Sequence, residues 1–401
     1  MVSGHARLVY VCQTFPWLTQ TFTVREVRLL REEGVDLHVA SFRRPPAELM
    51  DASTRAMLEV TSFLPAPRSA AALAPLGRAI RRQPRLVGRL VWDAFLARGL
   101  VQTSVLLRLR NMLAVARGAW IAEQFPHAQL FHAEFADEAA TAAMAAAELG
   151  DAQFSFKSHS SYNPQQLDRK MDRAAFIAVE NEFDRRYYFA WAPDARILVN
   201  RSGIVLGPPE LRAKPSDELR ILSVGTLQEK KGHRYLLGAL KLLAARGVSF
   251  HCLIVGSGPL ERELRSIARD LGDRVVIEPY RPHEEVLALY RQYEVLALPC
   301  VVTDEGDRDG LPNVLIEAAA AGCVLVSSPV SAIPELIEDG VSGLLVPERD
   351  EGALADVLER LVDDAELRER LVEGAERVVR ERFDLRVNVR ELAGRFRSEL
   401  V

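Results

Sequence analysis

The chain of 401 residues has few cysteines and no long hydrophobic run, and each shortage excludes a class of protein. Its four cysteines, Cys12, Cys252, Cys300 and Cys323, lie far apart and fit no zinc-binding spacing. Three of them lie in strand-like runs, where a buried free thiol is expected, and this suits a reducing cytoplasm. No run approaches the roughly 18 apolar residues of a membrane-spanning helix, and the first one, LVYVC, is too short for a secretory signal.

The chain as a whole also lacks a net positive charge. The formal net charge is −4, so charge gives no argument for a nucleic-acid partner. The exception is the segment 68–118, in which ten arginines and a single acid, Asp93, interleave with Leu, Val, Trp92 and Phe95 at helical spacing. Such a segment fits a helix on an anionic membrane surface, a solvated basic face of helices packed on a sheet, or a lining for an acidic substrate.

Two nucleotide-binding fingerprints are absent. The dinucleotide motif G-x-G-x-x-G needs three glycines, and VGSGPLER at 255–262 supplies only the first two. The phosphate-binding loop G-x-x-x-x-G-K-[ST] does not occur. The sequence therefore argues against a dehydrogenase and against a P-loop enzyme.

Strands and helices alternate regularly along the chain, in two successive rounds. In the first round, the predicted strands are 7–12, 36–42, 130–135, 154–159, 174–180 and 196–200, with helices that include 22–34 and 137–148. A connector with proline, glycine and serine follows near 201–217. In the second round, the predicted strands are 219–225, 250–258, 275–280, 294–300 and 323–328.

Such alternation indicates parallel sheets. We expect an α/β protein with two doubly wound, Rossmann-like domains that face each other across a cleft, with ligands at the carboxyl ends of the strands. The N-terminal domain is expected to span residues 1–205, including the basic helical segment 68–118, and the C-terminal domain residues 206–380. A last helix in 381–401 is expected to pack back toward the N-terminal domain.

The stretch DEGDRDGLPNVLIEAAAAG, residues 304–322, joins an acidic loop to a helix. As an EF-hand loop beginning at Glu305 it fails, because Ile316 occupies the position of the bidentate carboxylate and Glu317 comes one residue late. The DRD triplet at 307–309 is only a weak metal signature. In a strand–loop–helix–strand arrangement, the free N–H groups of the helix start would instead bind phosphate or sugar oxygens. The alternative to such a binding site is a solvated acidic loop without a ligand, followed by an ordinary crossover helix.

Five segments of the C-terminal half together resemble family-4 glycosyltransferases, which are retaining enzymes with the GT-B fold. The segments are SVGTLQEKKGHRYLLGAL, IVGSGPLERELR, VLALPC, DGLPNVLIEAAAAG and SPVSAIPELIEDGVSGLLVPERD. In the N-terminal half, FPWLTQTFTVREVRLLREEG, FHAEFAD and FSFKSHS resemble the branch that builds colanic acid and other exopolysaccharides. The resemblance covers nearly the whole chain, in the right order.

The resemblance implies a donor site in the C-terminal domain. Asp309 and Glu317 match the family's Glu-x7-Glu pair, so that Asp309 would reach the donor sugar hydroxyls and Glu317 the ribose hydroxyls. Aspartate in place of glutamate shortens that reach by one methylene. The backbone and helix dipole of the intervening residues would face the sugar and the diphosphate: Gly310, Leu311, Pro312 and Asn313.

Lys231 matches the family lysine that neutralises the leaving diphosphate. The family usually has an arginine where this chain has Thr226, so one cation is missing unless Lys230 or an N-terminal-domain arginine replaces it. Tyr280 and Arg281 occupy the nucleobase-pocket segment, in which the contacts are largely to backbone. They therefore do not distinguish uridine from guanosine.

In the N-terminal domain, His159 matches a family histidine at the end of a strand, near the transferred sugar and the acceptor. Thr19, Gln20 and Thr21 stand where the branch has Ser-Glu-Thr, and they are expected on the acceptor side. The acceptor side departs from the family at Gln20 and at Tyr162, where an aspartate is frequent.

We thus expect His159, Lys231 and Asp309 to carry the chemistry. Two other histidines are not expected to act in the reaction. His132 is expected to pack in the core, and His233 is expected on the surface of a helix.

The expected function is a cytoplasmic, bacterial, retaining glycosyltransferase for hexosyl or N-acetylhexosaminyl groups. The donor would be a nucleoside-diphosphate sugar, most simply UDP-linked, and the acceptor a hydroxyl of a glycan, a lipid-linked glycan or a small natural product. The mechanism implied is front-face displacement without a metal ion or other cofactor. Peripheral contact with the inner face of the membrane would suit the basic segment, and no nucleic acid is expected as a partner. The alternatives are a sugar-nucleotide-binding protein that is inactive, as Thr226 and Tyr162 would suggest, or an epimerase or phosphorylase of the same architecture.

Overall fold

The computed structural model describes residues 6–17, 21–46, 50, 52–66, 69–96, 105–159, 167–207 and 218–400. It divides the chain into two compact units. The N-unit consists of Met1–Ser202 together with Arg386–Val401, and the C-unit of Gly203–Leu385. The chain therefore passes between the units twice, after Ser202 and after Leu385.

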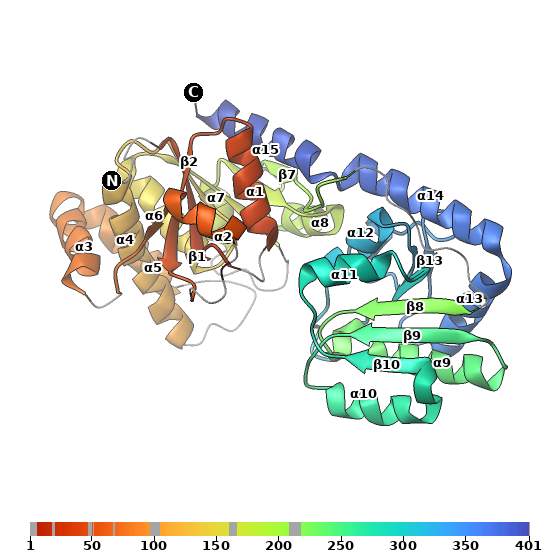
Figure 1. Cartoon of the computed structure of the whole chain (residues 1–401). Helices are drawn as coiled ribbons and strands as arrows, with labels where there is room; N and C mark the ends of the chain where they lie inside the picture. The colour runs from red at the N-terminus through yellow and green to blue at the C-terminus, as the bar shows by residue number, and fades with distance from the viewer. Residues whose placement is uncertain are drawn as a thin grey trace. The chain divides into compact units, whose positions relative to one another are not determined.

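The N-unit is built on a seven-stranded sheet with the order β3-β2-β1-β4-β5-β6-β7 (Figure 1). Its strands are β1 Leu8–Thr14, β2 Leu37–Arg43, β3 Thr61–Phe63, β4 Leu130–Ala133, β5 Gln153–Ser158, β6 Phe176–Val179 and β7 Ile197–Val199. Every pairing between them is parallel. The strand order reverses between β1 and β4, which are direct neighbours. In an open α/β sheet, the carboxyl ends of the strands at such a reversal are where ligands bind.

The N-unit helices connect these strands, and the last one comes from the end of the chain. They are α1 Thr21–Glu32, α2 Ala52–Ala56, α3 Ala70–Arg82, α4 Pro84–Leu96, α5 Val105–Gln124, α6 Glu138–Gly150, α7 Leu167–Arg173, α8 Glu182–Trp191 and α15 Leu385–Glu399. The predicted basic helical segment 68–118 forms α3, α4 and most of α5. Strand β3 was not predicted, because a run of three residues is too short to show a pattern.

Alternate residues of the N-unit strands pack on opposite faces of the sheet. Val9 and Phe156 belong to the apolar core that includes residues of α5 and α6. On the other face, the ring of Phe396 in α15 lies 5.8 Å from that of Tyr10 and 5.0 Å from that of His132. The C-terminal helix α15 thus covers this second face. His132 is fully buried there, which agrees with the packing role expected from the sequence.

The C-unit has a six-stranded parallel sheet with the order β10-β9-β8-β11-β12-β13. Its strands are β8 Leu219–Val224, β9 Phe250–Val255, β10 Val275–Glu278, β11 Val295–Leu298, β12 Val324–Ser327 and β13 Leu344–Leu345. Its α-helices are α9 His233–Ala245, α10 Glu261–Ala268, α11 His283–Tyr290, α12 Asn313–Ala320, α13 Glu351–Asp363 and α14 Ala365–Arg382. The strand order reverses between β8 and β11.

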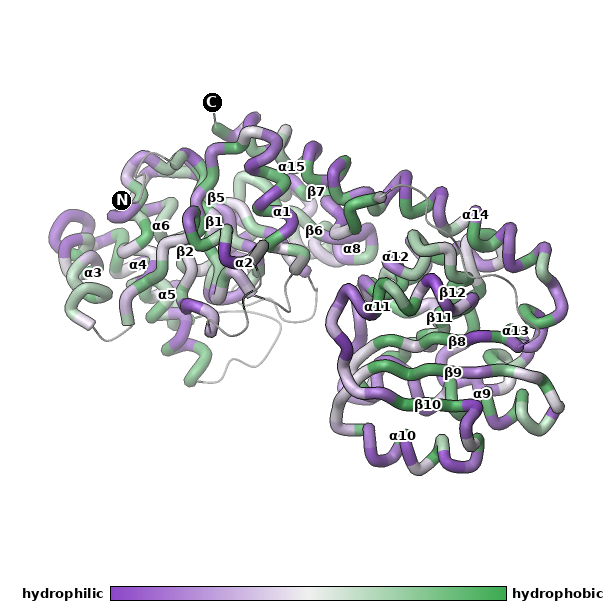
Figure 2. Tube along the Cα trace, viewed as in Figure 1, coloured by the Kyte–Doolittle hydropathy of each residue, from purple (hydrophilic) through white to green (hydrophobic). Residues whose placement is uncertain are grey.

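Both faces of the C-unit sheet are apolar. Ile221 and Cys252 belong to the core shared with α9, α10 and α13, whereas their neighbours Leu222 and Leu253 belong to the core shared with α11, α12 and α14. Figure 2 shows β9 as mainly hydrophobic along its length, as expected of a strand that is buried on both faces. All four cysteines are buried and free, and the sequence had predicted this for three of them. None of the described helices is long and apolar enough to cross a membrane.

Candidate functional site

Two loops meet at the strand reversal of the C-unit. The loop after β8 carries Thr226 and Lys231, and the loop after β11 carries Asp309. A backbone hydrogen bond joins the loops, because the N–H of Val301 donates to the carbonyl of Lys230 at 3.0 Å. Strands β8 and β11 are paired neighbours, so the two loops emerge at the edge of the sheet where ligands are expected.

Lys231 and Asp309 form a sheltered ion pair. The distance from Nζ to Oδ2 is 2.7 Å, and the side chains are 13% and 17% exposed. Lys230 lies beside them, with its Nζ 3.8 Å from Asp309 and 3.2 Å from Asp307. The structure thus brings together two of the three residues predicted to carry the chemistry and places a second cation next to them.

Two glycines give the lysine loop its shape. Gly232 has φ +72°, and a Cβ at this position would lie 1.7 Å from the carbonyl oxygen of Pro299. A larger residue would therefore separate the two loops. A Cβ at Gly225 would come 3.3 Å from Cδ of Lys231, so this glycine leaves room for the stem of the lysine.

Asp304, another carboxylate of the acidic loop, is also paired. Arg349 donates to Asp304 at 3.1 Å and to the carbonyl of Val302 at 2.8 Å. Among the residues that the structure describes, no group of three or more His, Cys, Asp and Glu is arranged to hold a metal ion. Ile316, at the position where an EF-hand needs a carboxylate, is 2% exposed in the core.

Glu317 lies in the middle of α12, with 11% of its side chain exposed. Its Oε2 accepts a hydrogen bond of 3.3 Å from the hydroxyl of Tyr290, and its Oε1 lies 3.8 Å from Nδ1 of His283. Burial, together with the charge of Glu317, raises the pKa of Tyr290 well above its usual value. The tyrosine therefore stays a neutral donor to the carboxylate.

Helix α12 begins at the acidic loop without a side-chain cap. Pro312 occupies the cap position and Asn313, the first helical residue, is exposed. The first N–H groups of the helix therefore lack a side-chain acceptor from the cap residue. Leu311 packs against the C-unit core, and the carbonyl of Gly310 accepts from the N–H of Ala332 at 3.1 Å.

Among the described residues, the others predicted to bind the donor form no hydrogen bond or ion pair with the Lys231–Asp309 pair. Thr226 is exposed, and its hydroxyl lies 3.5 Å from Oε1 of Gln228. Tyr280 and Arg281 follow β10, which the sheet order separates from β8 by β9. Tyr280 is 75% exposed, and Arg281 donates from Nε to Glu278 at 2.7 Å.

The prediction that His233 lies on a helix surface is wrong. The residue is 1% exposed, and its Nδ1 lies 3.2 Å from Oγ of Ser223. Burial, with a further contribution from Lys231, lowers the pKa of His233 to about 4. His233 shares the buried face of α9 with Leu236, Leu237 and Leu240, and this i, i+3, i+4, i+7 spacing was the signal that could have placed it.

In the N-unit, His159 follows β5 and is held by two carboxylates. Its Nε2 lies 2.8 Å from Oε1 of Glu134, and its Nδ1 lies 3.0 Å from Oε1 of Glu180. The ring also packs 4.8 Å from that of Phe22 and 4.6 Å from that of Phe135. Both ring nitrogens are therefore engaged within the N-unit.

A second buried ion pair lies beside the first. Lys157, in β5, is 1% exposed and places its Nζ 2.6 Å from Oε2 of Glu26 in α1. The hydroxyl of Tyr10 donates to the other oxygen of Glu26 at 3.0 Å. The two ion-paired groups together form a set of buried charges that we call the N-unit charge cluster. Its members are Glu26, Glu134, Lys157, His159 and Glu180.

The cluster keeps His159 charged. Burial alone would lower the pKa of His159, but the ion pairs with Glu180 and Glu134 raise it to about 10. Burial would likewise raise the pKa of Glu180, but His159 and Lys157 bring it down to about 2. At neutral pH His159 is therefore an imidazolium that donates from both nitrogens and has no lone pair with which to take a proton.

Sequence reasoning missed the four partners in this cluster, Glu26, Glu134, Lys157 and Glu180. Lys157 is the one charged residue of β5, whose sequence is QFSFKS, and a charge on a buried strand requires a partner. Glu26 is 3% exposed on the inner side of α1, among residues such as Val27 and Leu30. Lys157 and Glu26 were therefore the two positions from which buried charges in the N-unit could have been predicted.

The predicted acceptor residues are mostly outside the described part of the chain. This applies to Thr19 and Gln20, and also to Tyr162. Thr21 is the first residue of α1, but its side chain is not among those described.

Residues 218–364, which contain the Lys231–Asp309 pair and α12, match a family model described as glycosyl transferases group 1. They form a group 1 glycosyltransferase domain. The domain covers the C-unit from β8 through α13. The predicted family is thereby confirmed for this part of the chain.

Curated relatives of the chain include two glycosyltransferases named for the biosynthesis of colanic acid and of amylovoran. The putative colanic acid biosynthesis glycosyltransferase WcaL of Escherichia coli K12 is 37% identical over 241 residues, 58% of each chain. The amylovoran biosynthesis glycosyltransferase AmsK of Erwinia amylovora is 41% identical over 175 residues, 42% of each chain. The matched segments thus span about half the length of these relatives.

Solved structures with the same fold match nearly the whole chain. The Anabaena protein HepE, in complex with UDP and glucose, superposes with a TM-score of 0.68 over 98% of this chain and 100% of its own, at 14% identity. This likeness establishes the GT-B fold, with its two Rossmann-like units, as predicted.

Proposed function

We propose that the protein is a retaining glycosyltransferase that uses a UDP-sugar and needs no metal ion. The observation that carries this proposal is the Lys231–Asp309 pair, at 2.7 Å, at the strand reversal of a group 1 glycosyltransferase domain and beside the uncapped start of α12. Lysine and helix N–H groups are suited to a diphosphate, and a carboxylate to sugar hydroxyls. The colanic acid and amylovoran relatives and the UDP complex of HepE support this choice of activity and donor.

In the proposed reaction, the bond between the sugar carbon and the diphosphate oxygen breaks, and the acceptor hydroxyl attacks from the same face. Lys231, with Lys230 beside it, and the start of α12 stabilise the charge that develops on the leaving UDP. Asp309 exchanges its contact with Lys231 for a donor sugar hydroxyl earlier, when the donor binds. The departing phosphate oxygen takes the acceptor proton, so no protein base is required.

His159 is proposed to act on the sugar and acceptor as a fixed cation, since both of its nitrogens already donate to carboxylates. The acceptor is proposed to be a glycan, a lipid-linked glycan or a small natural product. The polysaccharide relatives favour the lipid-linked class.

The proposal is tested by screening nucleotide sugars for protection against melting and for release of UDP with and without added glycan acceptors. We expect UDP to raise the Tm and one UDP-sugar to be turned over. Binding without any turnover would favour an inactive sugar-nucleotide-binding protein. Release of sugar phosphate or of an epimerised sugar would favour the phosphorylase or epimerase alternative.

Glu317→Gln is expected to weaken UDP binding at least tenfold. The ribose hydroxyls would lose a charged acceptor, and a hydrogen bond to a charged group contributes about 1.5–3 kcal/mol. Calorimetry on the folded variant measures this affinity. Glu338→Gln, a similar charge change in the same unit but outside the proposed site, is the control, and equal affinities for all three proteins would contradict the role of Glu317.

Turnover of the donor is expected to survive excess EDTA, because Lys231, Lys230 and the start of α12 supply the charge that a metal ion would otherwise provide. UDP release is measured with and without the chelator. Complete loss of turnover that Mg²⁺ or Mn²⁺ restores would instead point to the DRD triplet at 307–309 as a metal site.

We also propose that the helices of the basic segment contact a membrane surface. Among the residues that the structure describes, seven of the fourteen exposed large hydrophobic side chains come from residues 73–109, and they are Leu73, Ile80, Trp92, Phe95, Val105, Leu106 and Leu109. Among them, Trp92 and Phe95 stack at 6.3 Å. The exposed Arg81, Arg82 and Arg85 make no ion pair with any described residue. Exposed aromatic and aliphatic side chains next to unpaired arginines suit anionic lipid.

Binding to vesicles of phosphatidylglycerol is therefore expected at low salt and should fall steeply as salt rises. Sedimentation with vesicles measures it. Trp92→Ser should weaken binding, whereas Trp191→Ser, a comparably exposed tryptophan on α8, should not. No binding at low salt would mean that the basic segment is a solvated face or serves a soluble acceptor.

A further inference from the structure

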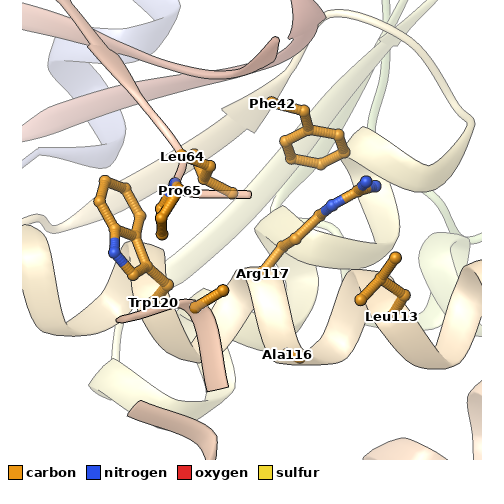
Figure 3. Close-up of a pocket in the computed structure, with 8 residues that line it drawn as sticks. Phe42, Leu64, Pro65, Leu113, Ala116, Arg117 and Trp120 are labelled. Atoms are coloured by element: carbon orange, nitrogen blue, oxygen red, sulfur yellow. The ribbon is translucent and has the colours of Figure 1, made fainter. Parts of the chain in front are cut away.

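The hollow beside Arg117 in the N-unit is a packing space and not a ligand site. It lies between the end of β2, the residues after β3 and helix α5, and it has room for about one water molecule (Figure 3). The guanidinium of Arg117 lies 4.3 Å from the centre of the Phe42 ring, so its charge already faces an aromatic partner. A buried polar contact with consequences for a ligand lies instead in the C-unit, at Glu317.

Helix α11 approaches both carboxylate oxygens of Glu317. The hydroxyl of Tyr290, the last residue of the helix, donates to Oε2 at 3.3 Å. Nδ1 of His283, the first residue of the helix, lies 3.8 Å from Oε1. The two residues are close to two helical turns apart and therefore share one face of α11. The carboxylate is thus contacted from both ends of a single helix.

The tyrosine is itself held firmly. Tyr290 is 1% exposed in the C-unit core, and its carbonyl accepts a hydrogen bond of 3.2 Å from the thiol of Cys323. Cys323 directly precedes β12 and is also buried. The position of the Tyr290 hydroxyl is therefore set by the core, and a buried hydroxyl of this kind needs a partner, which Glu317 provides.

The plane of a glutamate carboxylate is not fixed by its own covalent structure, because rotation about the last side-chain bond is broad. Two ribose hydroxyls can donate to one carboxylate together only when both of its oxygens face them. A hydrogen bond to one oxygen restricts this rotation. The Tyr290 hydroxyl therefore determines how the carboxylate of Glu317 faces a ribose.

We propose that Tyr290 is a positioning residue for ribose recognition, and that the protein prefers nucleotides with both ribose hydroxyls to 2′-deoxynucleotides. This inference rests on the proposed function, in which Glu317 binds the ribose of the donor. It narrows the donor class to sugars linked to a ribonucleoside diphosphate, and it makes sugars linked to a deoxynucleoside diphosphate poor donors.

UDP and 2′-deoxy-UDP, which differ only in the 2′-hydroxyl, are the probes, and calorimetry on the full-length protein measures both affinities. The wild type is expected to bind UDP about tenfold more tightly or better, as for a hydrogen bond to a charged group. Tyr290→Phe removes the hydroxyl and keeps the ring. It should weaken UDP binding about 2- to 10-fold, the usual effect of one hydrogen bond. Binding of 2′-deoxy-UDP should be nearly unchanged, because a single hydroxyl can be met by a carboxylate in either orientation.

Two further variants separate positioning from packing. Tyr293→Phe removes a hydroxyl from the same core, where the Tyr293 ring lies 5.0 Å from the guanidinium of Arg220, and it should change neither affinity. In the Glu317→Gln background, the further change Tyr290→Phe should have no effect on UDP binding, because the tyrosine acts through the carboxylate.

An unchanged preference for UDP in Tyr290→Phe, or an equal loss of both nucleotides, would overturn the inference. The same loss in Tyr293→Phe or in the Glu317→Gln background would also overturn it. Equal affinities of the wild type for UDP and 2′-deoxy-UDP would overturn it as well, but would leave UDP binding and the proposed function intact. A wild type that binds neither nucleotide would refute the proposed function, and the inference with it.

Discussion

Lys231→Met is expected to lower kcat/KM for the UDP-sugar by about 10- to 150-fold, the equivalent of a charge-assisted contact of about 1.5–3 kcal/mol. The loss should fall mainly on kcat, because the charge on the diphosphate is largest as the sugar departs. The effect should exceed that of Lys230→Met, whose Nζ is shared between Asp307 at 3.2 Å and Asp309 at 3.8 Å. Initial rates of UDP release measure both variants.

Asp309→Asn distinguishes this interpretation from a general loss of structure. Asp309 neutralises Lys231 at 2.7 Å before the donor arrives, so its removal should free the lysine. UDP should then bind more tightly although turnover falls, because the donor sugar loses a charged acceptor. Weaker UDP binding in Asp309→Asn, or near-normal turnover in Lys231→Met, would contradict the assignment of the pair.

Lys157→Met is expected to destabilise the N-unit by about 3–5 kcal/mol, the usual cost of leaving one member of a buried ion pair without its partner. Glu26, 3% exposed, would retain the hydroxyl of Tyr10 as its one remaining hydrogen-bond partner among the described residues. Urea unfolding measures the change in free energy. The double variant Lys157→Met/Glu26→Gln should recover part of the loss, because it removes both charges, and a double variant less stable than the single one would refute this explanation.

The pH at which the unfolding free energy should be measured is set by the pKa values of two other members of the N-unit charge cluster, Glu180 and His159. Glu180 has its pKa lowered from 4.5 to about 2, so its contribution is full above pH 4.5 and is lost as pH falls toward 2. His159 has its pKa raised from 6.5 to about 10, so its contribution is full below pH 6.5 and is lost as pH rises toward 10. Between pH 4.5 and 6.5 both contributions are intact. Burial raises the pKa of Glu26 from its usual value of 4.5, so the effect of Lys157 is measured near pH 6.5, at the upper end of this range.

Periodicity predicted most strands because they are central in parallel sheets. Strand β11 is apolar on both faces, so it appears in the sequence as a short uninterrupted hydrophobic run, and in β9 such a run is broken only by His251. Short strands at the edge of a sheet show a weaker hydrophobic pattern, and β3, an edge strand of three residues, shows none. His233 was misplaced because a single histidine was judged by its type, although its spacing from Leu236, Leu237 and Leu240 is that of a buried helix face.

The sequence by itself determined the two rounds of alternation, the family of the C-terminal half, and the choice of Lys231, Asp309 and Glu317. The alternation rests on local patterns, whereas the family and the choice of these residues rest on the resemblance of short motifs to a known family, and both are contained in the order of residues along the chain. Only the tertiary structure decided which charges meet. Lys157 and Glu26 are 131 residues apart, and Lys231 and Asp309 come from loops on different strands. Their contacts depend on strand order and on which face each residue of a strand occupies, and neither can be read from one segment alone.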